Sequence, residues 1–247
     1  MCGRFVATTG PADLARLYDA QPQVPEEAFT PSWNIAPTRD VLAVLERLDT
    51  DSGEVSRQVR ALRWGLVPSW SKTPSAAAKM INARSETAHV KPAFRSAFSK
   101  RRCIIPSTGY YEWRQAPGGP GGRPYKQPYF LAPADGTLLG MAGLYEFWKD
   151  STRPEDDPLA WLVTCTVLTT EATDNAGRVH DRMPLTITAA NQAVWLDPDL
   201  TDPDSVRDLL HTPSGAELTV TAVATTVNSV RNDGPELLTE VEDPLPV

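Results

Sequence analysis

Two neighbouring segments, Arg101-Arg-Cys-Ile-Ile-Pro106 and Gly109-Tyr-Tyr-Glu-Trp113, decide the fold class of this chain. Each is a short run rich in β-branched or aromatic residues, the composition that favours a strand over a helix. They follow each other closely, so two strands succeed one another with no helix between them. The second strand carries a carboxylate, Glu112, between Tyr111 and Trp113. An acidic residue is unusual in a buried strand, and it marks a candidate functional position.

The same alternation of short apolar runs and turns continues on both sides of this pair. Strands are predicted at 3–8, 41–48, 55–64, 126–131, 138–147, 161–170 and 217–227, and helices at 11–18, around 92–98, at 189–196 and at 202–210. Residues 21–40 are expected to form a Pro-rich loop, 115–124 a Gly/Pro-rich hairpin connection and 171–177 a helical turn. Many short strands with few helices predict an α+β fold, a single domain with a largely antiparallel, barrel-like core and peripheral helices. We expect this domain to span residues 1–247, with a core at about 2–232 and a C-terminal tail at 233–247.

Composition excludes several classes of protein. Hydrophobic residues make up 41% of the chain and charged residues 22%, which are ordinary globular values. No apolar run is long enough to cross a bilayer, and no secretory signal is visible. The three cysteines are an odd number without a CxxC pair, which argues against a disulfide framework and a zinc site. We therefore expect a cytoplasmic monomer that has no metal, no cofactor and no membrane partner.

The charge is unevenly distributed along the chain. The net charge is −7, yet residues 60–130 contain 13 Lys and Arg against two acidic residues. Phosphate binding depends on the local potential, so a basic face on an acidic protein can still bind DNA. The alternative is that these charges scatter over the surface once the chain folds.

Cys2 follows Met1 directly, and a side chain this small normally lets an aminopeptidase remove the methionine. The chain would then begin with a 1,2-aminothiol. Its amine can condense with an aldehyde to an imine, and its thiolate can then close a five-membered thiazolidine ring. Unperturbed pKa values near ~8 for the amine and ~8.5 for the thiol leave only minor fractions of each reactive form at pH 7.

Four separated stretches need a common explanation: Met1-Cys-Gly-Arg-Phe5, Ile81-Asn-Ala-Arg-Ser-Glu86, Gly109-Tyr-Tyr-Glu-Trp113 and Val179-His-Asp-Arg-Met-Pro184. Together they closely resemble the SRAP family (SOS response-associated peptidase). The resemblance extends over nearly the whole chain and includes 33–37, 64–70, 91–95, 168–172 and 227–232. The one visible departure is the enlarged loop 115–124, which could alter an edge of a DNA groove.

The resemblance implies a protein that binds single-stranded DNA at an abasic site and crosslinks itself to the lesion. A ring-opened abasic sugar is an aldehyde, the electrophile that an N-terminal aminothiol is suited to trap. The implied role is to shield abasic sites from cleavage and error-prone bypass, in association with the nucleoid when DNA is bound. No cofactor is needed, because the aldehyde carries the reactivity.

Catalytic roles follow from the chemistry together with the resemblance. Cys2 is the predicted nucleophile. Glu112 can accept a proton from the amine or thiol and return it during dehydration. His180 suits proton donation to the sugar ring oxygen, because histidine moves protons in both directions near neutral pH. Asn82 is expected to orient the amine or the sugar.

Six further residues are predicted to contact DNA. Phosphate contacts are assigned to Arg4, Arg84 and Arg182, whose alternative role is ion pairing with the abundant carboxylates. Stacking or wedging between bases is assigned to Pro37, Trp70 and Trp113, whose alternative role is packing.

Two other functions remain open at this point. A thiol peptidase would use Cys2 as nucleophile, His180 as base and Asn82 or Glu112 to orient the histidine. A non-catalytic module would bind single-stranded DNA through the basic stretch and the tryptophans alone.

Overall fold

The two central strands of the sequence form β7 (Arg102–Ser107) and β8 (Gly109–Ala116), and they lie in different sheets. The computed structural model describes residues 2–49, 52–210 and 217–245. Because only Thr108 separates β7 from β8, the chain passes there from one sheet directly into the other. This crossing joins a barrel to an open sheet.

Five strands close into the barrel in the order β5-β4-β7-β10-β11. Their bounds are Val55–Trp64 (β5), Asp40–Leu48 (β4), Arg102–Ser107 (β7), Leu139–Lys149 (β10) and Trp161–Glu171 (β11). Neighbouring strands are antiparallel except at the closure, where β5 and β11 run parallel and Trp64 lies opposite Cys165. One face of these strands contributes Leu45, Cys103 and Met141 to a single apolar cluster. The closed ring thus has a packed interior.

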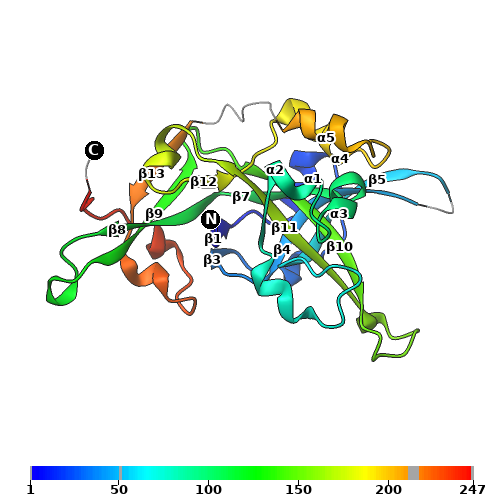
Figure 1. Ribbon diagram of the computed structural model, residues 1–247, viewed down its shortest axis with the longest axis horizontal. Coiled ribbons are helices and arrows are strands. Elements are labelled where there is room, and N and C mark those ends of the chain that lie inside the picture. Colours follow the sequence, from blue (N-terminus) through cyan, green and yellow to red (C-terminus); the bar gives the residue numbers. More distant parts are fainter. Residues whose placement is uncertain (1, 50–51, 211–216, 246–247) are drawn as a thin grey trace.

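The opposite face of the barrel is covered by helices (Figure 1). Their bounds are Pro11–Tyr18 (α1), Ser85–Ala88 (α2), Arg95–Lys100 (α3), Gln192–Leu196 (α4) and Pro203–Leu209 (α5). Alternate strand residues such as Val44 and Ile104 share a second apolar cluster with Leu14, Phe98 and Trp195 of α1, α3 and α4. The period-two alternation of the strands therefore separates the barrel interior from the helix-covered face.

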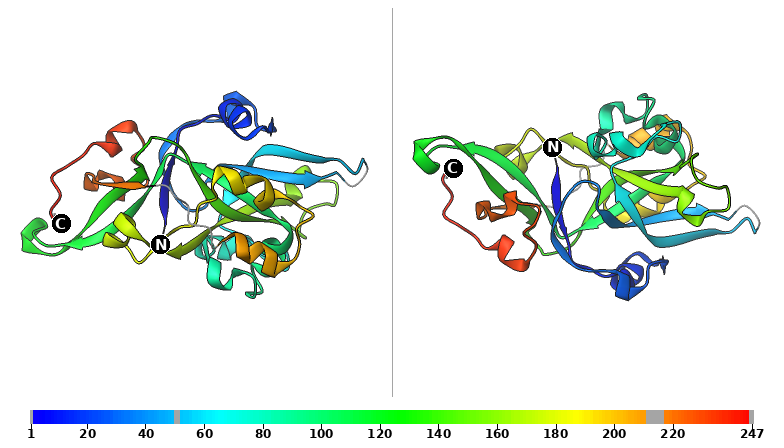
Figure 2. Two further views of the ribbon diagram at one scale, coloured as in Figure 1. Left: turned by 90° about the horizontal axis from the view of Figure 1, so that it is seen from above. Right: turned by 90° about the horizontal axis from the view of Figure 1, so that it is seen from below.

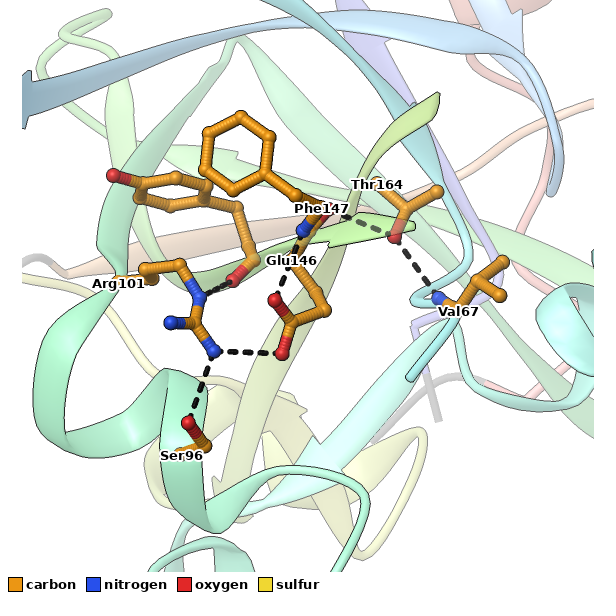
Figure 3. A network of polar contacts seen from close by, with 7 residues as sticks. Val67, Ser96, Arg101, Glu146, Phe147 and Thr164 are labelled. Atoms are coloured by element: carbon orange, nitrogen blue, oxygen red, sulfur yellow. Dashed lines mark hydrogen bonds and ion pairs between the residues drawn. The ribbon is translucent and has the colours of Figure 1, made fainter. Parts of the chain in front are cut away.

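Two arginines at the start of β7 attach the helices to the barrel. The buried guanidinium of Arg102 donates to the carbonyls of Phe98, Ser99 and Trp195, among others. Burial lowers the pKa of Arg102 to about 10. Figure 3 shows the second arginine, Arg101, donating to the carboxylate of Glu146 at 2.6 Å and to Ser96 of α3. These two basic residues thus serve the fold and are not available to a ligand.

The second sheet has the order β13-β9-β8-β1-β3 and is antiparallel throughout. Its strands are Leu218–Ala222 (β13), Tyr125–Pro133 (β9), Gly109–Ala116 (β8), Arg4–Ala7 (β1) and Ser32–Ile35 (β3). Figures 1 and 2 show the N-terminal end between this sheet and the barrel, with the β8–β9 hairpin extending to one end of the molecule and the β4–β5 hairpin to the other. The N-terminal strand is therefore central in space.

Three short strands complete the sheets and position parts of the site. The strand β6 (Asn82–Arg84) runs parallel to β11, β12 (Arg182–Pro184) is antiparallel to it, and β2 (Gln21–Pro22) pairs with β5. Because β6 and β12 both pair with the end of β11, segments nearly a hundred residues apart in the sequence meet there.

The predicted α+β class with a barrel-like core is confirmed, and α1 has the predicted bounds. The loop prediction for 21–40 was wrong at β2 and β3, strands of two and four residues that are too short to show alternation in the sequence. The strand predicted at 217–227 ends at Ala222, and Thr225–Asn228 forms a 3-10 turn instead. The segment after it packs back onto the sheet, where Leu237 is buried and Tyr129 donates to Asp243.

Candidate active site around Cys2

Cys2 lies two residues before β1, in the space where the two sheets meet. The register of β1 on β8 places Phe5 opposite Tyr110 and Arg4 opposite Tyr111. The Cys2 side chain is completely buried and belongs to the same apolar cluster as Phe5 and Tyr110. Met1, whose removal the sequence predicts, lies outside the described residues. The residue at the start of the described chain is thus a core residue.

Burial sets the protonation state of the thiol. It raises the pKa of Cys2 well above its usual range, and the neighbouring carboxylate of Glu112 raises it further. The thiol is therefore neutral in the resting protein at neutral pH. Any reaction at this sulfur needs a group that removes its proton, which makes the identity of the nearby base the central question.

Glu112 is the carboxylate whose charge acts on this thiol. It lies on β8 two residues after Tyr110, so the two side chains project from the same face of the strand. Glu112 is only 3% exposed, and burial raises its pKa, while the nearby charge of His180 lowers it. A carboxyl group with a raised pKa can both accept and return a proton closer to neutral pH.

Asn82 connects the barrel to the N-terminus. The pairing of β6 with β11 places Asn82 opposite Val167, and its Nδ2 donates to the backbone carbonyl of Cys2 at 2.7 Å. Its Oδ1 is buried and has no hydrogen-bond partner among the described residues. One end of the amide thus holds Cys2, and the other end is an acceptor available for a bound group.

His180 follows the 3-10 helix Asp174–Arg178 and precedes β12. Its Nδ1 accepts the backbone N–H of Arg182 at 2.9 Å and also lies 2.7 Å from Oδ1 of Asp181. The charge of His180 lowers the pKa of Glu112, so the two side chains lie near each other. The four predicted catalytic residues therefore come together from four separate segments of the chain.

The predicted DNA-contacting residues fall into two groups. Exposed or half-exposed side chains are those of Arg84, Trp70, Trp113 and Pro37, and Trp70 is 68% exposed. Trp113 donates from Nε1 to Asn228, which fixes the orientation of its ring. The backbone of Arg84 pairs with β11, but its guanidinium makes no hydrogen bond or ion pair within the described segments. These four stay candidate contacts.

The other two, Arg4 and Arg182, are engaged inside the protein. Arg4 donates to Oδ1 of Asn34 at 2.8 Å and to the carbonyl of Val227 at 3.0 Å, and its guanidinium lies 5.8 Å from the centroid of the Trp113 ring. Arg182 forms a two-pronged ion pair with Glu86. Their contacts with DNA also stay predictions. In the unbound protein, Arg4 holds neighbouring segments together and Arg182 forms an ion pair.

Two residues of the site carry no distinctive local signal. The hydroxyl of Tyr110 is buried without a partner among the described residues. Burial raises its pKa, and the neighbouring Cys2 and Glu112 raise it further. Glu86 reaches Arg182 across 96 positions of sequence. Both lie inside quoted motifs, but only the fold reveals which atoms they meet.

No helix in the described parts of the chain is long and apolar enough to cross a membrane. Within the same ranges, no group of three or more His, Cys, Asp or Glu side chains could hold a metal ion. The described cysteines, Cys2, Cys103 and Cys165, are all free thiols.

Known proteins are similar to this chain over nearly its whole length. The chain is 36% identical to the abasic site processing protein YoqW of Bacillus subtilis over 238 residues, covering 96% of this chain and 99% of the relative. It is 32% identical to the abasic site processing protein HMCES of Gallus gallus, covering 98% of this chain and 78% of the relative.

The fold matches a crystallised protein from Bacteroides thetaiotaomicron with a TM-score of 0.76 at 24% identity, covering 97% of this chain and all of that one. A protein from Bordetella bronchiseptica matches with a TM-score of 0.66 at 26% identity, covering 90% of this chain and all of that one. The family model for SOS response associated peptidase (SRAP) matches residues 1–230. The chain therefore belongs to the SRAP family.

Proposed function

We propose that this chain is an abasic site processing protein that binds single-stranded DNA and captures the ring-opened abasic sugar through Cys2 once Met1 has been removed. The observation that carries the proposal is the contact of Asn82 with the Cys2 backbone, beside a thiol whose pKa responds to Glu112. The names of YoqW and HMCES support the same substrate class.

The reaction forms a thiazolidine with loss of one water molecule. The neutral amine of Cys2 adds to the aldehyde carbon to give a carbinolamine, and water leaves to give an imine. The sulfur then adds to the imine carbon, and the proton that it loses ends on the ring nitrogen. One C–N and one C–S bond replace the C=O bond, and no oxidant or cofactor takes part.

Each proton transfer has a candidate group in the site. Glu112 takes the thiol proton, which the buried sulfur does not lose on its own, and returns protons during dehydration. His180 donates to the sugar ring oxygen and so releases the aldehyde. Asn82 holds Cys2 and offers its unpartnered Oδ1 to the amine or the sugar.

Holding the reacting groups in position supplies the rest of the rate acceleration. A reaction between groups held in place gains about 7 kcal/mol or more over its bimolecular counterpart. In this proposal the exposed Trp70 and Arg84 hold the strand on either side of the lesion. The crosslink would shield the abasic site in the cytoplasm until the damage is repaired.

The decisive experiment mixes purified protein with single-stranded DNA carrying one abasic site and resolves the products on a denaturing gel. We expect a heat-resistant shifted band with an intact N-terminal Cys2. Cys2→Ala should abolish the band, and so should an N-terminal extension that survives methionine removal. Persistence of the band in Cys2→Ala would refute the proposed chemistry.

The family description preserves a second candidate, a thiol peptidase with Cys2 as nucleophile and His180 as base. Cleavage of peptides without a DNA adduct would support it. A third outcome, a shift only in native gels that is insensitive to Cys2→Ala, would support a non-covalent DNA-binding module.

A further inference from the structure

Arg182 links two parts of the molecule through both its side chain and its backbone. Its Nη1 and Nη2 donate to the two carboxylate oxygens of Glu86 at 2.7 and 2.9 Å, and Nη2 also donates to the carbonyl of Thr169 at 2.6 Å. The Arg182 side chain is only 11% exposed. The hydrogen bonds from Arg182 lower the pKa of Glu86, so the carboxylate is charged throughout the neutral range. A two-pronged pair of this kind fixes position as well as charge.

The backbone N–H of the same residue donates to Nδ1 of His180 at 2.9 Å. This hydrogen bond requires an Nδ1 without a proton, so the proton of the neutral ring is on Nε2. Oδ1 of Asp181 lies 2.7 Å from the same Nδ1 and would instead require a proton there. One ring nitrogen cannot satisfy both partners at once, so Arg182 and Asp181 compete for it.

We propose that Glu86 is a positioning residue that decides this competition. By holding Arg182 in β12, Glu86 keeps the backbone N–H of Arg182 aimed at Nδ1 and so holds the proton of His180 on Nε2. Asp181 is the opposing partner. Its side chain is 86% exposed, so solvent weakens its attraction for a proton on Nδ1. The effect on the rate rests on the proposed function, whereas the tautomer is a property of the free protein.

The assignment matters because the tautomer decides whether Nε2, the ring nitrogen that does not face the backbone N–H of Arg182, carries a proton. An Nε2–H can be given to an oxygen beside Glu112, whose charge interacts with His180. With the proton on Nδ1, the histidine would present only a lone pair there. A group that sets a histidine tautomer is a recurrent part of acid–base sites, and loss of the correct tautomer slows them strongly.

The experiment measures the ring nitrogens of the histidines by ¹⁵N NMR on the free protein. The sequence contains three histidines, so His180→Ala identifies the signal of His180. We expect the Nε2–H form in the unaltered protein and a shift toward Nδ1–H in Glu86→Gln. Glu155→Gln, which removes the ion pair of an exposed carboxylate with Lys149, is the matched control and should leave the signal unchanged.

A second variant separates tautomer control from general disturbance of the fold. Adding Asp181→Ala to Glu86→Gln removes the competing acceptor, and the signal should return toward Nε2–H. Crosslink formation should be about 10-fold slower in Glu86→Gln and largely restored in the double variant. DNA binding should stay within twofold of the unaltered protein.

The outcomes distinguish the two proposals. An unchanged His180 signal in Glu86→Gln overturns the inference, and so does an equal shift in Glu155→Gln. A signal that shifts as expected, in a protein that forms no crosslink even when unaltered, would uphold the role of Glu86 and refute the proposed function.

Discussion

The side-chain amide of Asn82 donates to the backbone carbonyl of Cys2 across 2.7 Å, although 80 positions of sequence separate the two residues. Cys2 precedes β1 and Asn82 begins β6, so the contact joins the N-terminus to the strand that pairs with β11. The position of Cys2, the proposed nucleophile, is therefore set by the barrel as well as by the strand that follows it.

Removal of this contact should slow crosslinking by about 10- to 100-fold, because a displacement near 1 Å at a reacting group has an effect of that size. Asn82→Ala is the change, and single-turnover gel assays measure the rate. The lost hydrogen bond should lower the free energy of unfolding by about 1 kcal/mol. Asn175→Ala is a matched control, because Asn175 likewise donates to a backbone carbonyl, that of Leu218. Equal rates in the two variants would contradict an orienting role for Asn82.

The pH dependence of crosslinking should report Glu112. Burial raises the pKa of this carboxyl group, so the carboxylate is lost as pH falls through a value above the ordinary ~4.3. The rate should therefore decline toward acid at a higher pH than an exposed glutamate would give. Glu112→Gln should lower the rate at pH 7 by about 100-fold or more and remove this contribution to the profile. If the rate of the Glu112→Gln variant declined toward acid at the same pH as that of the unaltered protein, the decline would have to be assigned to another group.

The same substitution tests the effect of Glu112 on stability. A carboxyl group whose pKa is raised by folding adds stability at low pH and loses it as pH rises through the folded value. Glu112→Gln should therefore unfold at a higher temperature than the unaltered protein at pH 8, and the gap should narrow toward acid. Glu46→Gln is the contrasting variant, because it breaks an ion pair with Arg57 away from Cys2 and should destabilise.

The hydroxyl of Tyr110 should affect the rate of the reaction and should not be needed for the stability of the fold. This buried hydroxyl has no hydrogen-bond partner among the described residues, and its pKa is raised by burial and by the neighbouring Cys2 and Glu112. Tyr110→Phe removes a polar group that pays a desolvation cost without a bond, so stability should stay equal or rise by up to about 1 kcal/mol. Crosslinking should slow several-fold if the hydroxyl binds the sugar.

Its neighbour on the other face of β8 provides the control. Tyr111 donates to the carbonyl of Trp33 at 2.9 Å, so Tyr111→Phe should cost about 1 kcal/mol of stability and leave crosslinking unchanged. Denaturant unfolding and single-turnover assays on both variants give the comparison. A loss of stability in Tyr110→Phe would show that its hydroxyl has a structural partner.

Local signals in the sequence predicted local structure well. The helix Pro11–Tyr18 begins at a proline and has apolar residues at helical spacing, and the structure has the same bounds. The β4–β5 and β10–β11 strands were predicted because alternation and turn residues are properties of short windows. Closure of the barrel was not specified in this way, because the β5–β11 pairing rests on two residue pairs between distant segments.

In the candidate site, too, the sequence predicted features of single motifs but not the contacts between distant segments. Cys2, Asn82, Glu112 and His180 could be proposed because each lies in a motif that resembles the SRAP family and carries a group suited to the expected chemistry. The partners of Arg182 could not be named, because an arginine in a sequence is equally suited to a phosphate or a carboxylate. Only the fold places Glu86 beside it, on a helix that follows β6.

The salt dependence of DNA binding should distinguish the roles of Arg84 and Arg182. Arg84 is exposed and has no ion pair within the described ranges, whereas Arg182 is buried against Glu86. If Arg84 contacts a phosphate, Arg84→Ala should weaken binding to single-stranded DNA several-fold and reduce the slope of log K against log salt by about 0.7 to 1.

Arg182→Ala should instead leave that slope nearly unchanged and lower the crosslinking rate, because its guanidinium is neutralised by Glu86 in the free protein. Arg207→Ala is the control, since Arg207 lies on α5 and pairs with Asp204. Fluorescence anisotropy over a series of salt concentrations gives the slopes. A reduced slope in Arg182→Ala would mean that DNA displaces Glu86 from the ion pair, and the phosphate contact predicted for Arg182 would then hold in the complex.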